Sequence, residues 1–256
     1  MLRPRIIPSL LIHNQGLVKT TAFAAPKYVG DPINAVRIFN DKEVDELSVF
    51  DIDATVAGRP PDYGLIERLA AECRMPLCYG GGVTTEAQFG EIVSLGVEKV
   101  AVSAAAIADP DLVTRAATMV GGQSVVVVLD VKRRQGGYEV FTHNGRTATG
   151  LDAVETARRM ADAGAGELVI NAIDQDGAMH GYDQTLVAAV RVAVTVPLTI
   201  LGGCGSLAHM AGLFRDHGTI GAAAGSLFVF KGIYRAVLIN YPARADRDAL
   251  VAGARS

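Results

Sequence analysis

The sequence predicts an α/β fold built on parallel strands, and three observations support this prediction. Short apolar runs rich in β-branched residues alternate with amphipathic stretches of helical length along the 256 residues. Most of these runs are apolar throughout, which is typical of strands buried on both faces of a parallel sheet. The chain also repeats itself once, because matching segments recur at a spacing of 121 residues.

The apolar runs supply the expected strands. They comprise Arg5 to Leu11, Glu46 to Ile52, Pro76 to Tyr79, Lys99 to Ser103, Val125 to Asp130, Glu167 to Ala172, Pro197 to Leu201 and Ala222 to Ser226. Between them, helices are expected over Asp31 to Lys42, Asp109 to Met119, Asp152 to Ala163 and Asp183 to Val194. Pro32 suits a first helical turn, Asp152 is a candidate N-cap, and Gly164 is a candidate C-terminal stop.

The repeat predicts how the strands are arranged. Asp53 recurs as Asp174, and the pairs Pro76-Leu77 and Gly81-Gly82 recur as Pro197-Leu198 and Gly202-Gly203. Two copies of (βα)₄ add to a TIM (βα)₈ barrel, whose typical length of ~250 residues matches this chain. Closure also removes both sheet edges. We therefore expect one domain over residues 1–256, with half-barrels of about 1–121 and 122–256; an open doubly wound sheet is the alternative.

Composition excludes several classes of protein. The 24 Lys and Arg against 27 Asp and Glu give a net charge of −3 without a basic run, which argues against nucleic-acid binding. The apolar stretches fall well short of the ~20 residues that span a bilayer, and no signal peptide is evident. Three cysteines argue against a disulfide framework and favour the cytoplasm. The five histidines lack zinc spacing, so no metal and no cofactor is expected.

Two glycine-rich segments at equivalent repeat positions predict a site for a substrate with two phosphates. Chemistry in a TIM barrel lies at the carboxyl ends of the strands, and glycine followed by a helix N-terminus suits a phosphate. Small residues end the following strands. The candidate phosphate-binding residues are Gly81, Gly82, Ser103 and Ala104 in the first half and Gly202, Gly203, Gly225 and Ser226 in the second, with Asp176 and Gly177 helping to hold a phosphate loop. Tight turns alone are the alternative interpretation of these glycines.

Carboxylates at strand ends are the candidate catalytic groups, because burial raises the pKa of a carboxyl toward the range useful for proton transfer. Asp130 is the strongest candidate, since it ends an otherwise apolar strand. Asp51 is a second candidate and could instead orient its neighbours. Asp53 and Asp174 are better interpreted as cap or turn residues. Lys19, expected in a Gly-containing loop after the first strand, could reach a substrate phosphate or be a plain solvated charge.

Charged residues also begin four strands, at the opposite end of the barrel. They are Arg5, Glu46, Lys99 and Glu167. Two cations and two anions could ring the bottom opening. Such a ring is either a structural ion network or a gate into the barrel interior.

Four segments resemble the HisF family, the cyclase subunits of imidazole glycerol phosphate synthase. They are Ile6 to Pro8, Gly80 to Gly82, Asp174 to Gly177 with Gly181 to Asp183, and Gly202-Gly203. The resemblance covers nearly the whole chain. It implies a TIM barrel that binds a bis-phosphate substrate, with a HisH-like glutaminase docked at the barrel bottom and ammonia passing through the barrel to the mouth.

The resemblance also implies roles for individual residues. Arg5, Glu46, Lys99 and Glu167 match the family's ammonia gate, Lys19 matches its loop lysine, and Asp130 matches one of its two catalytic aspartates. The other aspartate is replaced, because the first strand carries Leu11 where the family has Asp. Asn171 replaces a small hydroxyl residue, and Leu201 replaces Ser.

This departure makes the chain similar to the HisF-like branch of bacterial surface-polysaccharide clusters, in which a sugar amidotransferase is a further partner. Lys27 to Pro32 and Gly225 to Phe230 also resemble that branch. We therefore expect a subunit of a glutamine amidotransferase complex that delivers ammonia for amidation of a sugar. There are two alternatives. One is a genuine cyclase, which is a lyase of histidine biosynthesis, with Asp51 or His13 in place of the missing base. The other is a non-catalytic phosphate-binding scaffold.

Overall fold

Eight parallel strands close into a barrel in the computed structural model, which describes residues 3–253. They are β1 (Arg5–His13), β4 (Leu47–Asp51), β5 (Leu77–Gly80), β6 (Lys99–Val102), β7 (Val125–Arg134), β10 (Glu167–Ala172), β11 (Leu198–Leu201) and β12 (Gly221–Ala224). Strand β1 pairs in parallel with both β4 and β12, and the β7–β10 pair joins the two halves on the other side. The predicted TIM barrel is therefore confirmed.

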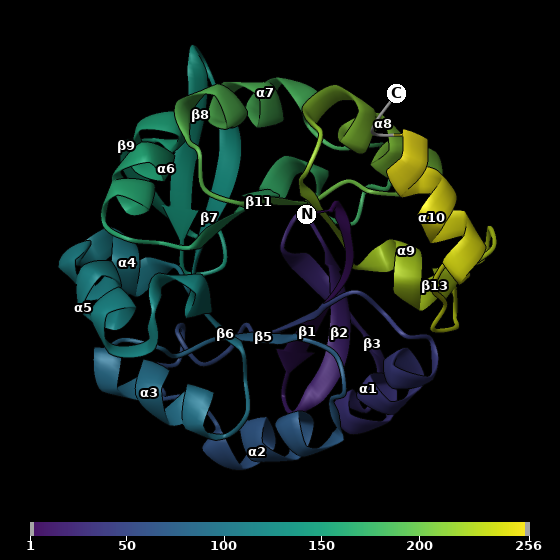
Figure 1. Ribbon diagram of the computed structural model, residues 1–256, viewed down its shortest axis with the longest axis horizontal. Helices are drawn as coiled ribbons and strands as arrows, with labels where there is room; N and C mark the ends of the chain where they lie inside the picture. The colour runs from purple at the N-terminus through teal and green to yellow at the C-terminus, as the bar shows by residue number, and fades with distance from the viewer. Residues whose placement is uncertain (1–2, 254–256) are drawn as a thin grey trace.

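The helices form a ring outside the strands (Figure 1). They are α1 (Pro32–Asp41), α2 (Tyr63–Glu72), α3 (Glu86–Ser94), α4 (Ala104–Ala108), α5 (Asp111–Val120), α6 (Ala153–Asp162), α7 (Gln184–Ala193), α8 (Leu207–His217), α9 (Ser226–Val229) and α10 (Arg244–Gly253), with short 3₁₀ turns η1 (Gly122–Ser124) and η2 (Ile173–Gln175). Asp side chains cap several of them. Asp31 and Asp152 accept backbone N–H bonds as N-caps of α1 and α6, and the sequence predicts the second of these caps.

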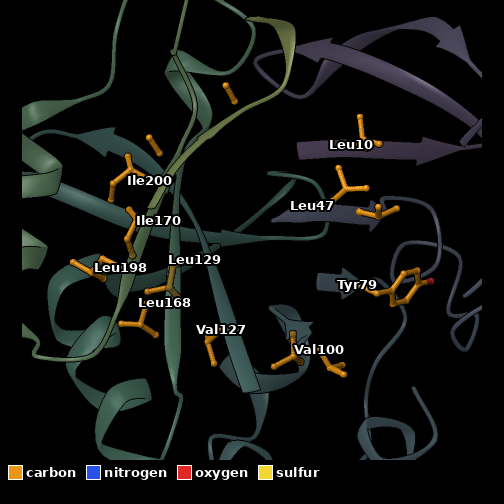
Figure 2. Close-up of a cluster of buried hydrophobic side chains, with 14 of the residues drawn as sticks. Leu10, Leu47, Tyr79, Val100, Val127, Leu129, Leu168, Ile170, Leu198 and Ile200 are labelled. Atoms are coloured by element: carbon orange, nitrogen blue, oxygen red, sulfur yellow. The ribbon is translucent and has the colours of Figure 1, made fainter. Parts of the chain in front are cut away.

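Side chains alternate between two apolar layers along each strand. One set faces the helices and forms the main core, to which Val127 and Leu129 of β7 belong (Figure 2). The other set faces the barrel interior, where Val126 and Val128 of β7 meet a smaller cluster. That cluster comprises Ile7, Cys78, Ala101, Val126, Val169, Leu201 and Ala223, with Phe50 and Val128 against it. The middle level of the barrel interior is thus lined by apolar side chains.

Strands β1 and β7 continue beyond the barrel into two antiparallel extensions. The first adds β2 (Gly16–Thr21) and β3 (Ala24–Gly30), and the second adds β8 (Gly137–Thr142) and β9 (Thr147–Asp152). Lys19 therefore lies on strand β2, and its predicted place in a loop is wrong. The reason is the tight turn at Asn14 and Gln15, whose φ angles of 49° and 62° fold β2 directly back onto β1.

The end of the described chain packs against the barrel bottom and its flank. A small hairpin of β13 (Phe230–Lys231) and β14 (Ala236–Val237) precedes α10, which lies against α8. The Tyr241 hydroxyl donates to the Ile6 carbonyl oxygen at 2.8 Å, so this segment is tied to β1. Among residues 3–253, no helix is long and apolar enough to cross a membrane.

Candidate functional site

A cavity of about 640 Å³ lies at the carboxyl ends of the barrel strands. All the residues predicted for the mouth line it: Lys19, Asp51, Gly81, Gly82, Ser103, Ala104, Asp130, Asp176, Gly177, Gly202, Gly203, Gly225 and Ser226. Sequence reasoning missed other lining residues, among them Arg59, Phe23, His143 and Asn144. The cavity therefore draws on both half-barrels and on both strand extensions.

The two glycine-rich segments form matching cradles in the two halves. Gly81 has φ +128° and Gly202 has φ +97°, values that side-chain-bearing residues rarely adopt. A Cβ on Gly81 would overlap the Asp51 carbonyl oxygen, and one on Gly202 would overlap the Ala172 carbonyl oxygen. Asp51 and Ala172 are themselves 121 residues apart. Both cradles thus need glycine for the same reason, namely close approach to the end of the preceding strand.

Each cradle has a basic side chain on the cavity wall, but the two cations differ in setting. Lys19 is buried beside Gly225 in the second half, where its Nζ donates to the Ser9 carbonyl oxygen. Burial lowers the pKa of Lys19 to about 8, although the charge of Asp176 opposes this. In the first half, Arg59 lies 3.9 Å from the Asp51 carboxylate, and its side chain is 50% exposed.

Asp130 and Asn171 form a hydrogen-bonded pair in the mouth. They stand opposite each other in the register of β7 and β10, and Asn171 Nδ2 donates to Asp130 Oδ1 at 2.8 Å. Burial raises the pKa of Asp130 to about 7, with the Asn171 bond opposing and the Asp176 charge assisting. A carboxyl poised near neutral pH is suited to general acid–base chemistry.

Leu11 and Phe50 occupy the corresponding places in the first half. Leu11 pairs with Phe50 between β1 and β4, as Asp130 pairs with Asn171 between β7 and β10. Both apolar side chains line the same cavity. The mouth therefore carries one polar pair and one apolar pair at equivalent positions.

The other acidic candidates hold the backbone of the loops. Asp51 Oδ1 accepts the N–H groups of Asp53 and Ala54, and so orders the turn that follows β4. The Asp53 carboxylate bonds to His13 Nδ1 at 2.7 Å, and Asn14 occupies the second ring nitrogen. Both ring nitrogens of His13, one of the two predicted replacement bases, therefore already have hydrogen-bond partners.

The two strand extensions meet over the mouth. The Asp176 carboxylate accepts from the Thr20 hydroxyl at 2.7 Å and from the Phe23 N–H at 3.3 Å, so it fixes the first extension to the second half. Asn144 Nδ2 donates to the Ile52 carbonyl oxygen at 2.7 Å, which fixes the second extension to the first half. A Cβ on Gly145 would lie 3.3 Å from the Phe23 ring. Each extension is thus braced by the opposite half-barrel.

The charged residues predicted at the barrel bottom do form a ring. Arg5 bonds to Glu46 at 2.5 Å and to Glu167 at 2.6 Å, and Lys99 bonds to each glutamate at 2.8 Å. Burial alone would raise the pKa of Glu167, but the hydrogen bonds and charges of Arg5 and Lys99 hold it at about 2. The Thr199 hydroxyl donates to Glu167 at 2.5 Å. Glu167 is therefore ionised across the physiological pH range.

The cysteines are poor nucleophiles in this setting. Burial raises the pKa of the Cys204 thiol to about 11 although it lies in the cavity wall. Burial likewise raises the pKa of Cys78 in the barrel interior. Within residues 3–253, no three His, Cys, Asp or Glu side chains come together in a way that could hold a metal ion.

Comparison with known proteins gives a consistent result. Residues 5–234 match the family described as histidine biosynthesis protein. A relative from Leptospira interrogans, named "Putative imidazole glycerol phosphate synthase subunit HisF", is 53% identical over 252 residues, which cover 98% of this chain and 99% of the relative. Two relatives carry the same name with the endings hisF3 and hisF2. The one from Vibrio vulnificus is 53% identical over 96% of each chain, and the one from Pseudomonas aeruginosa is 49% identical over 94% of this chain and 97% of its own.

Proposed function

The chain belongs to the histidine biosynthesis protein family, and on that premise we propose that it is a HisF-type synthase subunit that delivers ammonia to its mouth. In this proposal a HisH-like glutaminase docks at the barrel bottom and releases ammonia beneath the charged ring. The ammonia is used to amidate a surface-polysaccharide sugar, with a sugar amidotransferase as a further partner. The relatives' names support a multi-subunit enzyme, because each is called a subunit.

The observation that carries the proposal is Leu11. It stands in the first half where Asp130 stands in the second, so the mouth has a single carboxylate at this level. Leucine can neither donate nor accept a proton, and losing one member of an acid–base pair commonly lowers a rate by about 10²–10⁴-fold. Imidazole ring closure in the resembled family uses both aspartates. This chain therefore retains the phosphate cradles without the acid–base pair.

The barrel interior supports a path for ammonia. Above the charged ring lies a mostly apolar layer that includes Ile7, Ala101 and Val169. A small neutral molecule crosses such a layer far more readily than an ion, because burying an unpaired charge is costly. The same layer would keep bulk water and buffer ions from passing through the barrel to the mouth. Delivery through the barrel therefore favours neutral ammonia over ammonium.

A second candidate function is the genuine cyclase of histidine biosynthesis. The observation that favours it is the presence of two matching cradles on one cavity together with Asp130, whose pKa of about 7 suits proton transfer. This function requires another group to perform the chemistry of the missing aspartate. Asp51 lines the cavity, but its Oδ1 already accepts two backbone N–H bonds.

One assay separates the two candidates. The purified protein is supplied with saturating ammonium chloride and the phosphoribulosyl-formimino substrate of the cyclase, and imidazole glycerol phosphate formation is followed. Ammonium bypasses the glutaminase, so the assay isolates the chemistry of the barrel. We expect the substrate to bind without turnover, and the gene to leave a cyclase-deficient histidine auxotroph unable to grow.

Clear turnover would overturn sugar amidation in favour of the cyclase. The positive test uses the complete complex with glutamine labelled with ¹⁵N in its amide group, and mass spectrometry of the sugar product. Labelled sugar from the wild type is expected. If the Asp130→Asn variant leaves both glutaminase activity and labelling unchanged, the barrel is a passive scaffold rather than a participant.

A further inference from the structure

Strand β10 carries three different kinds of side chain into the barrel, one above the other. Glu167 belongs to the charged ring, Val169 to the apolar interior cluster, and Asn171 to the mouth cavity. Because alternate residues of a strand face the same side and each residue advances ~3.3 Å, Asn171 lies roughly 13 Å above Glu167. A molecule that rises through the interior along β10 therefore leaves the apolar layer beside Asn171 and Asp130.

Asn171 has a carbonyl oxygen without a partner. The residue is 7% exposed, and its Oδ1 is buried with no hydrogen-bond donor among the described residues. Its orientation follows from its neighbour, because Asn171 Nδ2 donates to Asp130 Oδ1, an oxygen that can accept whether the carboxyl is ionised or carries its proton on Oδ2. A buried acceptor left unsatisfied is costly, which marks this oxygen as a place for a ligand that donates.

The surroundings narrow the class of that ligand. Leu201 stands opposite Asn171 in the register of β10 and β11, and Leu11 and Phe50 line the same cavity; none of these side chains can donate a hydrogen bond. Lys19, a basic side chain on the same cavity wall, donates to the Ser9 carbonyl oxygen. A carboxylate beside a free amide carbonyl suits a compact nitrogen with several N–H groups.

We propose that Asn171 and Asp130 together form a binding site for ammonium where the barrel interior opens into the mouth, with Asn171 Oδ1 as the positioning acceptor. The inference rests on the proposed function for the source of its ligand. Neutral ammonia that reaches the pair takes the proton of the Asp130 carboxyl, which leaves an ammonium ion against a carboxylate. The proton returns to the carboxylate when the nitrogen leaves as a nucleophile, so no other reactant is needed.

A titration tests this site without requiring any reaction. The pKa of Asp130 is followed by NMR of ¹³C-labelled aspartate, in ammonium chloride and in potassium chloride at equal ionic strength. The Asp130→Asn variant assigns the signal. Besides Asp130, the charged or titratable groups that share the cavity wall are Lys19, Asp51, Arg59, His143, Asp176 and Cys204, and the same groups are present in both salts. The potassium ion has the same charge as ammonium and a similar size, but it donates no hydrogen bonds.

In the wild type we expect ammonium to lower the pKa of Asp130 by about one unit relative to potassium, a tenfold coupling. In Asn171→Leu the difference should fall below about a third of a unit, since the acceptor is gone. Asn171→Thr provides a hydroxyl acceptor and should keep part of the pKa difference between the two salts. This variant replaces Asn171→Leu as the test if the leucine variant does not fold. Asn34→Leu, on the exposed side of α1, is the control and should behave as the wild type.

Equal responses of wild type and Asn171→Leu, or no difference between the two salts, would overturn the inference. A larger shift with methylammonium chloride would overturn the assignment to ammonia and indicate a substrate amine instead. The proposed function is judged separately, by product formation with ¹⁵N-glutamine. Labelled sugar without an ammonium-dependent titration would contradict this site alone.

Discussion

The two half-barrels agree at their glycine cradles and at the charged ring, but they differ at one level of the mouth. Gly81 and Gly202 stand 121 residues apart, and so do the ring residues Glu46 and Glu167. At the intervening level the first half has the apolar pair of Leu11 and Phe50, whereas the second half has Asp130 and Asn171.

This difference distinguishes features that both half-barrels must supply from features that one half-barrel can supply alone. A ligand with a phosphate at each end would engage two equivalent cradles, and a ring around the barrel axis draws its carboxylates from both halves. In the proposed function, proton transfer and nitrogen binding occur at one point, so one half can supply them. Phe50 in the first half then serves packing, as a member of the apolar contacts of the interior.

The largest expected effect comes from making the halves alike. Leu11→Asp places a second carboxylate at the level of Asp130 and restores the pair that the resemblance assigns to the cyclase. We expect ammonium-dependent formation of imidazole glycerol phosphate to rise above the wild-type background by about 10²–10⁴-fold, the usual contribution of one acid–base group. Steady-state kinetics with the phosphoribulosyl substrate measures the gain.

Leu11→Asn is the matched control, because it adds a polar group of similar size that cannot exchange a proton. It should remain at the wild-type background. A wild-type rate that Leu11→Asp fails to increase would mean that another group already performs this role. In that case the difference between the halves would be structural rather than functional.

The duplicated barrel was largely predictable from the sequence. Strands buried on both faces are continuously apolar, and the glycines of the cradles are fixed by backbone crowding, so both leave direct marks in the chain. The strand extensions were missed. Asn144-Gly145 is a turn signal that could have indicated the second one, since its φ angles of 56° and 70° match a tight hairpin.

The first extension and the unpaired carbonyl oxygen of Asn171 could not have been predicted in this way. The turn at Ala22 and Phe23 has φ angles of 48° and 62°, which neither residue favours. It is held by hydrogen bonds to Asp176, which is distant in sequence. The free carbonyl of Asn171 likewise depends on Asp130 on another strand. Both features depend on tertiary contacts, so they cannot be predicted from the local sequence.

The next effect tests the level at which the halves agree. Glu46→Gln and Glu167→Gln each remove one carboxylate from the ring, so that Arg5 and Lys99 share one carboxylate instead of two. Both glutamate side chains are 5% exposed, and breaking a buried ion pair typically costs about 3–5 kcal/mol. We expect Glu167→Gln to lie at the upper end, because Thr199 also donates to Glu167. Urea unfolding at neutral pH measures both losses.

The exposed Glu155→Gln on α6, whose side chain is 69% exposed, is the control and should change stability by less than about 0.5 kcal/mol. The pH dependence gives a second readout. Because the folded pKa of Glu167 is lowered to about 2, its contribution is fully present above the usual value near 4.5 and is lost as the pH falls through 2. Glu167→Gln should remove that part of the acid sensitivity.

The smallest expected effect concerns the cradles. Here we predict that equivalent substitutions in the two halves have equal effects. Gly81→Ala and Gly202→Ala each force a side chain onto a positive φ angle and onto the backbone of the preceding strand. Each should lower the free energy of unfolding by about 2–3 kcal/mol and weaken inorganic phosphate binding. Gly58→Ala, with φ +61° and open space around it, should cost only about 1 kcal/mol. A loss of phosphate binding in one variant alone would show that the cradles are equivalent in backbone but not in use.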